Sequence, residues 1–208
     1  MNLVFDIGAN MGQTVNIFMD EAEKVIAFEP NPKLTNHLKN RFEKDNVIVD
    51  SRAVSYKIGT QNFNISNYHF LSTFSNDWIS NSRFNNSYSW DDVLEVQTTT
   101  LNNIIDEYGI PDYIKIDVEG YEYEVLTSFT KLLDETILSF EWVEEQKYRI
   151  IEIVNHLFNI GYNKFYYTEG DEILFDKDIK WNFYDIFEFF SSLNEDRKEK
   201  WGMIYIKK

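Results

Sequence analysis

Residues 3–14 read LVFDIGANMGQT, and this stretch decides the fold. Its first part, Leu3–Ile7, is a short apolar run that Gly8 closes, a pattern typical of a strand buried on both faces of a sheet. The next segment, Gln13–Ala22, carries apolar residues at helical spacing. A buried strand that leads through glycine into a helix is typical of the first unit of an α/β fold.

The rest of the chain repeats this alternation of strand-length and helix-length segments. The further expected strands are Val25–Phe28, Val47–Val49, Tyr113–Asp117, Ile137–Trp142, Lys164–Thr168 and Met203–Ile206. The further expected helices are Asn31–Lys44, Leu101–Tyr108, Tyr121–Leu133, Tyr148–Ile160 and Asn182–Lys200. Such alternation predicts a doubly wound, Rossmann-like α/β sheet, largely parallel and covered on both faces. Because no linker-like Pro/Gly tract and no repeat interrupts it, we expect residues 1–208 to form a single domain.

The middle of the chain departs from the alternation. Gln61–Ile65 and Leu94–Thr98 alternate like extra strands, whereas the Ser- and Asn-rich residues 66–92 have the composition of a solvated loop. This loop is rich in aromatic side chains, whose faces can pack against sugar rings or other flat apolar groups. We therefore predict that it lies on the substrate side of the molecule. The predicted substrate contacts are His69, Phe70 and Trp78.

The chain is acidic and lacks cysteine. Its 35 acidic and 20 basic side chains leave a net charge of −15 at pH 7. An acidic surface repels phosphate backbones and anionic lipids, so we expect neither a nucleic-acid nor a membrane partner. Without cysteine there is no disulfide, zinc-thiolate site or cysteine nucleophile. No apolar run is long enough to span a membrane and no signal peptide is evident, so we expect a cytoplasmic protein.

The first strand-to-helix turn has the features of a site for an adenosine-containing ligand. Gly8 and Gly12 let backbone N–H groups approach a ligand, and Glu29, 21 residues beyond Gly8, can accept both ribose hydroxyls. A dinucleotide site needs a middle glycine, which here is Asn10, and Asp6 would repel a pyrophosphate but attract an ammonium group. S-adenosylmethionine has an amino-acid tail and no phosphate, so it is compatible both with Asn10 in place of the middle glycine and with the carboxylate of Asp6. An NAD-dependent oxidoreductase is the alternative.

Five blocks of sequence together resemble one enzyme family. They are DIGANMGQT at 6–14, FEPNP at 28–32, SRAVS at 51–55 with the later Gly59, TTTLNNII at 98–105 and KIDVEGYEYEVL at 115–126. In content and order they resemble the FkbM family of class I S-adenosylmethionine-dependent methyltransferases, over roughly Leu3 to Trp142. The resemblance implies a seven-stranded sheet whose last strand, Met203–Ile206, runs antiparallel. It also implies methyl transfer to a hydroxyl of a sugar, glycan or other small molecule.

The same resemblance implies a cofactor site at the strand ends. The implied contacts with S-adenosylmethionine are Asp6, Gly8, Ala9, Asn10, Gly12, Gln13, Thr14, Glu29, Pro30, Asn31, Arg52, Ala53 and Asp117. The glycine turn would hold the methionine part, Glu29 the ribose, and Pro30 and Asn31 would flank the adenine. The chain starts two residues before the first strand, without the helix that often covers this pocket. We therefore expect other cover, with a partner subunit of a homodimer as one source.

Methyl transfer to oxygen calls for a proton acceptor, because an alcohol is a weak nucleophile at neutral pH. The KIDVEG block places Lys115 and Asp117 on one face of a strand and Glu119 just past its end. We predict that Asp117 and Glu119 orient the acceptor hydroxyl and that one of them takes its proton. Glu141, at the next strand end, is a further candidate base, and Lys115 is a candidate partner of Asp117.

The remaining acidic residues near this block are expected to be structural. Glu122 and Glu124 fall in the first turn of a helix, where a solvated negative charge suits the helix dipole. Carboxylates would also suit Mg²⁺ or Ca²⁺, but no spacing indicates a third ligand, so we assign no metal.

Residues 181–201 form a second aromatic-rich segment, expected as a helical insertion before the last strand. Helical spacing of its aromatic residues favours a role in the core or in a dimer face. A catalytically silent module that binds cofactor or a partner is a third reading of the whole chain, against which the KIDVEG block argues.

Overall fold

A computed structural model describes residues 1–42, 46–176, 179–181, 184–194 and 196–208 of the protein. These residues contain a seven-stranded sheet. In spatial order its strands are β3 (Val47–Asp50), β2 (Lys24–Phe28), β1 (Leu3–Ile7), β7 (Tyr113–Ile116), β8 (Ile137–Val143), β10 (Trp201–Lys207) and β9 (Lys164–Tyr167). The last strand in sequence, β10, runs antiparallel to both of its neighbours, while β3, β2, β1, β7 and β8 run parallel to one another. The predicted sheet and its antiparallel last strand are confirmed.

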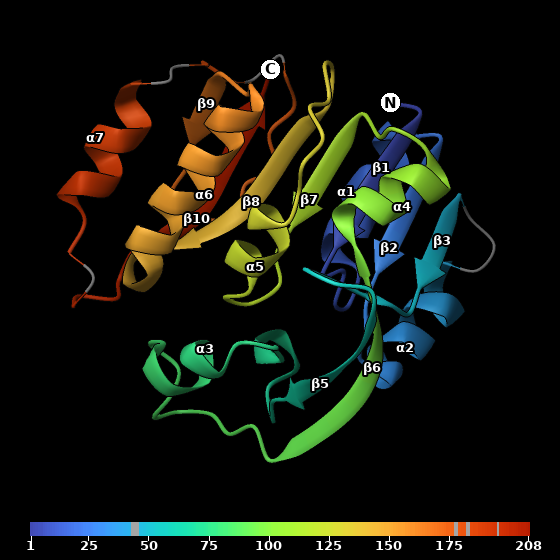
Figure 1. Cartoon of the computed structure of the whole chain (residues 1–208). Helices are drawn as coiled ribbons and strands as arrows, with labels where there is room; N and C mark the ends of the chain where they lie inside the picture. Colours follow the sequence, from blue (N-terminus) through green and yellow to red (C-terminus); the bar gives the residue numbers. More distant parts are fainter. Residues whose placement is uncertain (43–45, 177–178, 182–183, 195) are drawn as a thin grey trace.

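Helices cover both faces of this sheet (Figure 1). The helices are α1 (Gln13–Glu21), α2 (Pro32–Phe42), α4 (Leu101–Tyr108), α5 (Glu122–Thr127), α6 (Lys147–Ile160) and α7 (Tyr184–Ser192). Side chains alternate along each strand, so that Val4 packs in a cluster with α1 and α2 while Phe5 packs in the cluster of α4 to α7. Burial on both faces explains why every residue of β1 except Asp6 is apolar.

A small second sheet lies beyond the carboxyl ends of the parallel strands (Figure 1). It consists of β4 (Ala53–Ser55), β6 (Asp92–Thr100) and β5 (Gly59–Ile65), which confirms the two extra strands. The loop predicted at 66–92 is wrong in part, because it contains η1 (His69–Leu71) and α3 (Asn76–Asn81). The hydroxyl of Ser75 caps α3 by accepting a hydrogen bond from the backbone of Trp78 at 3.0 Å.

Two predicted helices are shorter in the structure. The helix expected to reach Leu133 ends at Thr127, because side chains rather than helical carbonyls accept the later N–H groups: Asn102 accepts from Thr130, and the Tyr162 hydroxyl accepts from Leu133. The helix expected over 182–200 is seen as α7, with a non-helical segment before β10. Residues 182, 183 and 195 of that prediction lie outside the described residues.

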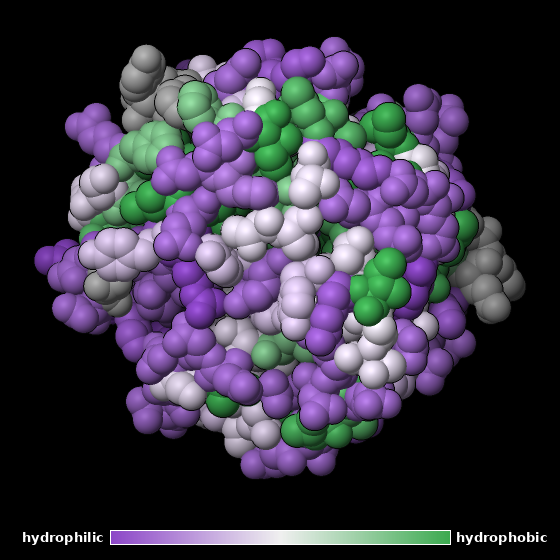
Figure 2. Space-filling model, in the orientation of Figure 1, coloured by the Kyte–Doolittle hydropathy of each residue, from purple (hydrophilic) through white to green (hydrophobic). Residues whose placement is uncertain are grey.

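Polar residues predominate on the face shown in Figure 2, and apolar residues form separate groups there. Within the described part of the chain, no helix combines the length and the apolar character needed to cross a membrane. The cytoplasmic location and the homodimer stay predictions.

Candidate active site

A cavity of about 330 Å³ lies at the carboxyl ends of the parallel strands, between the main sheet and the small sheet. Ligands of doubly wound sheets bind at this edge. The predicted site residues that line the cavity are Gly8, Ala9, Asn10, Gln13, Thr14, Glu29, Pro30, Ala53, His69, Phe70, Lys115, Asp117, Glu119 and Glu141. The structure therefore brings together residues from six separate parts of the sequence.

The predicted residues outside this lining are Asp6, Gly12, Asn31, Arg52 and Trp78. Asp6 and Asn31 are buried behind the wall. Arg52 forms ion pairs with Asp50 and Glu107, at 2.5 Å and 2.9 Å, and takes no part in the wall. Trp78 lines a neighbouring cavity instead.

The glycine turn after β1 lies against the ends of two strands. The backbone N–H groups of Gly8 and Ala9 both donate to the Phe28 carbonyl at 3.0 Å, which fixes the turn to β2. Gly8 has a left-handed φ of 84°, and a Cβ there would lie 1.8 Å from the Asp117 carbonyl oxygen. Only glycine fits this position, because any side chain would push the turn away from the end of β7.

Glu29 is held rigidly at the end of β2. Its Oε2 accepts from the backbone of Asn10 at 2.9 Å and its Oε1 from that of Asn31 at 2.8 Å. Burial raises the pKa of Glu29 to about 7, although these hydrogen bonds act in the opposite direction. Each carboxylate oxygen keeps a second lone pair, so the group can still accept hydroxyls from a ligand in the cavity.

Asn10 joins this turn to the small-sheet side of the cavity. Its Oδ1 lies 2.7 Å from Nδ1 of His69, and its Nδ2 donates to the His69 carbonyl at 3.3 Å. Asn10 has a left-handed φ of 49°, a conformation that asparagine tolerates better than most residues. The two hydrogen bonds fix η1 over the glycine turn, a contact between residues 59 positions apart that no local pattern reveals.

Asp6 and Lys115 form a buried charged pair beneath the cavity. Asp6 is 0% exposed, and neither of its carboxylate oxygens has a hydrogen-bond partner among the described residues. The Nζ of Lys115 lies 3.8 Å from Asp6 Oδ1 and 2.9 Å from Asp117 Oδ2. Burial raises the pKa of Asp6 to about 6, while Lys115 acts to lower it. A carboxylate that has no hydrogen bond among the described residues, and whose ion pair with Lys115 spans 3.8 Å, favours a further positive charge nearby.

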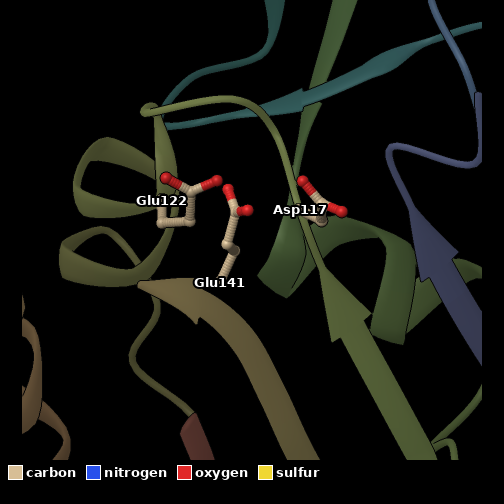
Figure 3. Close-up of side chains that lie close together, drawn as sticks. All are labelled: Asp117, Glu122 and Glu141. Atoms are coloured by element: carbon tan, nitrogen blue, oxygen red, sulfur yellow. The ribbon is translucent and has the colours of Figure 1, made fainter. Parts of the chain in front are cut away.

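Three carboxylates meet at the ends of β7 and β8 (Figure 3). Oxygen atoms of Asp117, Glu122 and Glu141 all lie within 4.8 Å of one another. Glu122 is 3% exposed and accepts from the backbone of Val118 at 2.8 Å, so its predicted solvated position is wrong. The reason is the left-handed turn at Glu119, whose φ is 56°, and the following glycine, which directs the first turn of α5 back toward the strand ends.

Burial makes the glutamates at these strand ends weaker acids than carboxylic acids in water. Burial raises the pKa of Glu122 to about 8, and it raises the pKa of Glu119 and of Glu141 well above the usual range, with the charge of Asp117 acting in the same direction. Carboxylates with raised pKa values are stronger bases and suit proton transfer. The oxygen atoms of the three clustered residues would also suit a divalent cation in number and chemistry.

The C-terminal third of the chain supplies cover for the cavity. The lining includes Asp171 and Ile173, after β9, together with Trp201 and Met203 of β10. None of these residues belongs to a sequence motif; the pairing of β10 with β8 brings Trp201 and Met203 to the site, and a bridge between Gly170 and Gly202 brings the segment after β9 beside β10. A contribution from a partner subunit stays a prediction.

The strand order, the antiparallel β10 and a site at the carboxyl ends of the parallel strands define a class I methyltransferase fold. A family model described as the methyltransferase FkbM domain matches residues 6–180, and the chain belongs to this family. The FkbM family implies S-adenosylmethionine as the cofactor. No curated protein sequence matches the chain.

The similar solved structures share little sequence with this chain. A methyltransferase FkbM from Methylobacillus flagellatus KT is similar with a TM-score of 0.55 and 14% identity, over 99% of this chain and 43% of that one. The chain thus spans less than half the length of that protein, and the likeness shows the fold alone. A precorrin-6y C5,15-methyltransferase from Geobacter metallireducens GS-15 has a TM-score of 0.49 and 12% identity, over 100% of this chain and 81% of that one. The N-methyltransferase NodS from Bradyrhizobium japonicum WM9 has a TM-score of 0.48 and 8% identity, over 99% and 84%.

Proposed function

We propose that this protein is an O-methyltransferase that uses S-adenosylmethionine to methylate a hydroxyl of a sugar, glycan or other small molecule. The observation that carries the proposal is the pair Glu119 and Glu141. Both line the cavity at its carboxylate-rich end, and both have a pKa well above the usual range. A hydroxyl acceptor needs such a base, because its proton must leave as the new bond forms.

The residues around the cavity fit the cofactor. The carboxylate of Asp6, buried behind the cavity wall and without a hydrogen-bond partner among the described residues, suits the ammonium group of the methionine tail, and Glu29 in the wall suits the ribose hydroxyls. The close approach of Gly8 to β7 keeps the turn open to a ligand without a side chain in the way. When bound, S-adenosylmethionine supplies an electrophilic methyl group on a sulfonium centre.

The protein's own groups handle the acceptor and its proton. Lys115 holds Asp117 by a 2.9 Å hydrogen bond, which leaves the other Asp117 oxygen to orient a hydroxyl. In the ionised state Glu119 or Glu141 accepts the hydroxyl proton. Desolvation makes these carboxylates stronger bases than carboxylates in water.

The two alternatives fit the site less well. An NAD-dependent enzyme would place a pyrophosphate near Asp6, whose buried negative charge would repel it. A silent binding module has no need for a cluster of carboxylates with raised pKa values, which are typical of catalytic sites.

The test combines binding and turnover. Calorimetry is expected to show binding of S-adenosylhomocysteine and none of NAD, and methyl-labelled S-adenosylmethionine is expected to label neutral glycans or metabolites from the source organism. With the labelled acceptor, Glu119→Gln and Glu141→Gln are each expected to lower kcat by about 100-fold, the usual effect of losing a general base, with unchanged affinity for S-adenosylhomocysteine.

The matched control is Glu95→Gln, an exposed residue of β6, which is expected to keep the full rate. NAD binding tighter than that of S-adenosylhomocysteine would overturn the proposed class of enzyme. Full activity in Asp117→Asn, Glu119→Gln and Glu141→Gln alike would overturn the assignment of the base.

A further inference from the structure

A second cavity, of about 190 Å³, adjoins the cofactor cavity. The two cavities share Phe70, Glu119, Glu141 and Trp201 in their walls. Residues of the glycine turn line only the first cavity, so a molecule in the second cavity would meet the candidate bases without occupying the place of the cofactor. This is the position that an acceptor needs if its hydroxyl is to face the methyl group of a cofactor in the first cavity.

Half of the residues that line this second cavity are aromatic. Tyr68, Trp78 and Phe84 join the shared Phe70 and Trp201. Neighbouring rings support these side chains: Tyr68 stacks on Tyr88 with ring centres 5.1 Å apart, and Trp78 meets the edge of Phe84 at 5.9 Å. The cavity thus offers apolar faces in fixed positions, which suit the C–H face of a ring.

The charges in the wall disfavour an anionic ligand. Arg83 is the one cationic side chain among the described lining residues, and Glu145 holds it through contacts of 3.0 Å and 2.6 Å. Its guanidinium also donates to the carbonyls of Glu199 and Lys200, at 3.1 Å and 2.8 Å. Because these partners already occupy the Arg83 guanidinium, and because the carboxyl groups of Glu119 and Glu141 line the same wall, an anionic ligand would meet no free cationic group among the described lining residues.

Trp78 contributes an unused hydrogen-bond donor. The residue is 2% exposed, and its indole Nε1 has no hydrogen-bond partner within the described part of the chain. A buried N–H without a partner is unfavourable, and an oxygen atom of a ligand would satisfy it. The wall therefore combines one donor with the acceptor oxygens of Glu119 and Glu141.

We propose that the second cavity is the acceptor subsite and that it selects an uncharged sugar ring over sugar acids and sugar phosphates. The apolar face of the ring packs on the aromatic wall, its hydroxyls donate to Glu119 and Glu141, and a ring or hydroxyl oxygen accepts from Trp78. This inference rests on the proposed methyltransferase function, and it adds the place and the chemical class of the acceptor.

Saturation-transfer NMR on the protein loaded with S-adenosylhomocysteine tests the inference without turnover. The neutral probes are the methyl pyranosides of glucose, galactose, mannose, rhamnose and fucose, and the anionic probes are methyl glucuronide and glucose 6-phosphate. We expect signal transfer to at least one neutral pyranoside and none to the anionic probes. Transfer to the anionic probes at equal strength, or to no neutral pyranoside, would overturn the inference.

Two variants locate the subsite. Trp78→Phe removes the N–H and keeps a ring, and it is expected to weaken pyranoside binding by about tenfold, the effect of one hydrogen bond. Phe84→Leu, which removes an aromatic face, is expected to weaken binding as well. The matched control is Trp181→Phe, which removes an N–H bonded to Asp176 and lies outside both cavities. Unchanged pyranoside affinity in both Trp78→Phe and Phe84→Leu would place the sugar elsewhere.

Binding of S-adenosylhomocysteine by calorimetry separates the two proposals. If the wild-type protein does not bind it, the proposed function fails. If the protein binds it but binds no neutral pyranoside, the methyltransferase proposal stands and the acceptor subsite fails.

Discussion

Asp6 shows how one residue can be unfavourable for folding and suited to binding. Its carboxylate is 0% exposed and has no hydrogen-bond partner among the described residues, and its ion pair with Lys115 spans 3.8 Å. We predict that Asp6→Asn raises the Kd for S-adenosylhomocysteine at least tenfold, about 1.4 kcal/mol, while the melting temperature at pH 8 stays the same or rises. The physical reason is that the ligand's ammonium loses its partner, whereas the fold loses a desolvated charge.

Calorimetry and thermal melts measure the two effects on the same preparations. Asp20→Asn, an exposed change at the end of α1, serves as the control and is expected to alter neither quantity. A variant that melts lower and binds normally would show that Asp6 serves the fold and not the ligand.

At the scale of elements, the site depends on how closely the turn after β1 approaches the end of β7. Gly8→Ala would place a methyl group 1.8 Å from the Asp117 carbonyl, in addition to the strain of a positive φ. We predict that this variant loses measurable binding of S-adenosylhomocysteine, because the turn must move away from the strand ends, and that its melting temperature falls by several degrees.

Gly170→Ala is the matched control for Gly8→Ala. Gly170 also has a positive φ, of 91°, but a Cβ there would meet no atom within 4 Å. The control therefore carries the conformational strain without the collision, and we expect it to bind the ligand normally. Equal loss of binding in both variants would assign the effect to backbone strain alone.

At the scale of the whole molecule, buried carboxylates set how stability depends on pH. Burial raises the pKa of Asp6, Glu29 and Glu122 to about 6, 7 and 8. A group whose pKa is higher in the folded state than in the unfolded chain stabilises the fold below its unfolded pKa, near 4–4.5, and this stability is lost as pH rises through the folded pKa. We predict a melting temperature higher at pH 5.5 than at pH 8, by on the order of 5 °C.

Other carboxylates limit the pH range of high stability at its acidic end. Burial works against the charge of Asp50 and Glu144, but hydrogen bonds to each hold its pKa below the usual value, so their stabilisation is lost as pH falls through those lowered values. Thermal melts from pH 4 to pH 9 measure the profile. Glu122→Gln is expected to flatten it between pH 5 and pH 8, whereas Glu95→Gln should preserve the slope. A profile that rises toward pH 8 in the wild type would contradict the prediction.

Local patterns in the sequence predict the main sheet well, because the spacing of buried residues within one strand or helix depends only on the geometry of that element. Leu101–Tyr108 is a helix with the predicted bounds, and Leu3–Ile7 is a strand with the predicted bounds. The helix expected over 121–133 fails at its C-terminal end, where distant side chains from residues 102 and 162 take the backbone N–H groups. Such partners leave no trace in local spacing.

Some residues of the candidate site can likewise be predicted from the sequence, and others cannot. Strand-end residues such as Asp6, Glu29 and Asp117 can be found from sequence, because the carboxyl ends of parallel strands meet at one edge of the sheet. The burial of Glu122 depends on the left-handed turn at Glu119, a conformation that is uncommon for glutamate and that spacing does not indicate.

The sequence by itself determined the class of fold, the family and the edge of the sheet where ligands bind, because these follow from short-range periodicity and from motifs in a fixed order. Only the tertiary structure decided that Asn10 bonds to His69, that Glu122 joins Asp117 and Glu141, and that residues from β10 and the segment before it cover the cavity. Those contacts join parts of the chain far apart in sequence, and packing of the whole core fixes them.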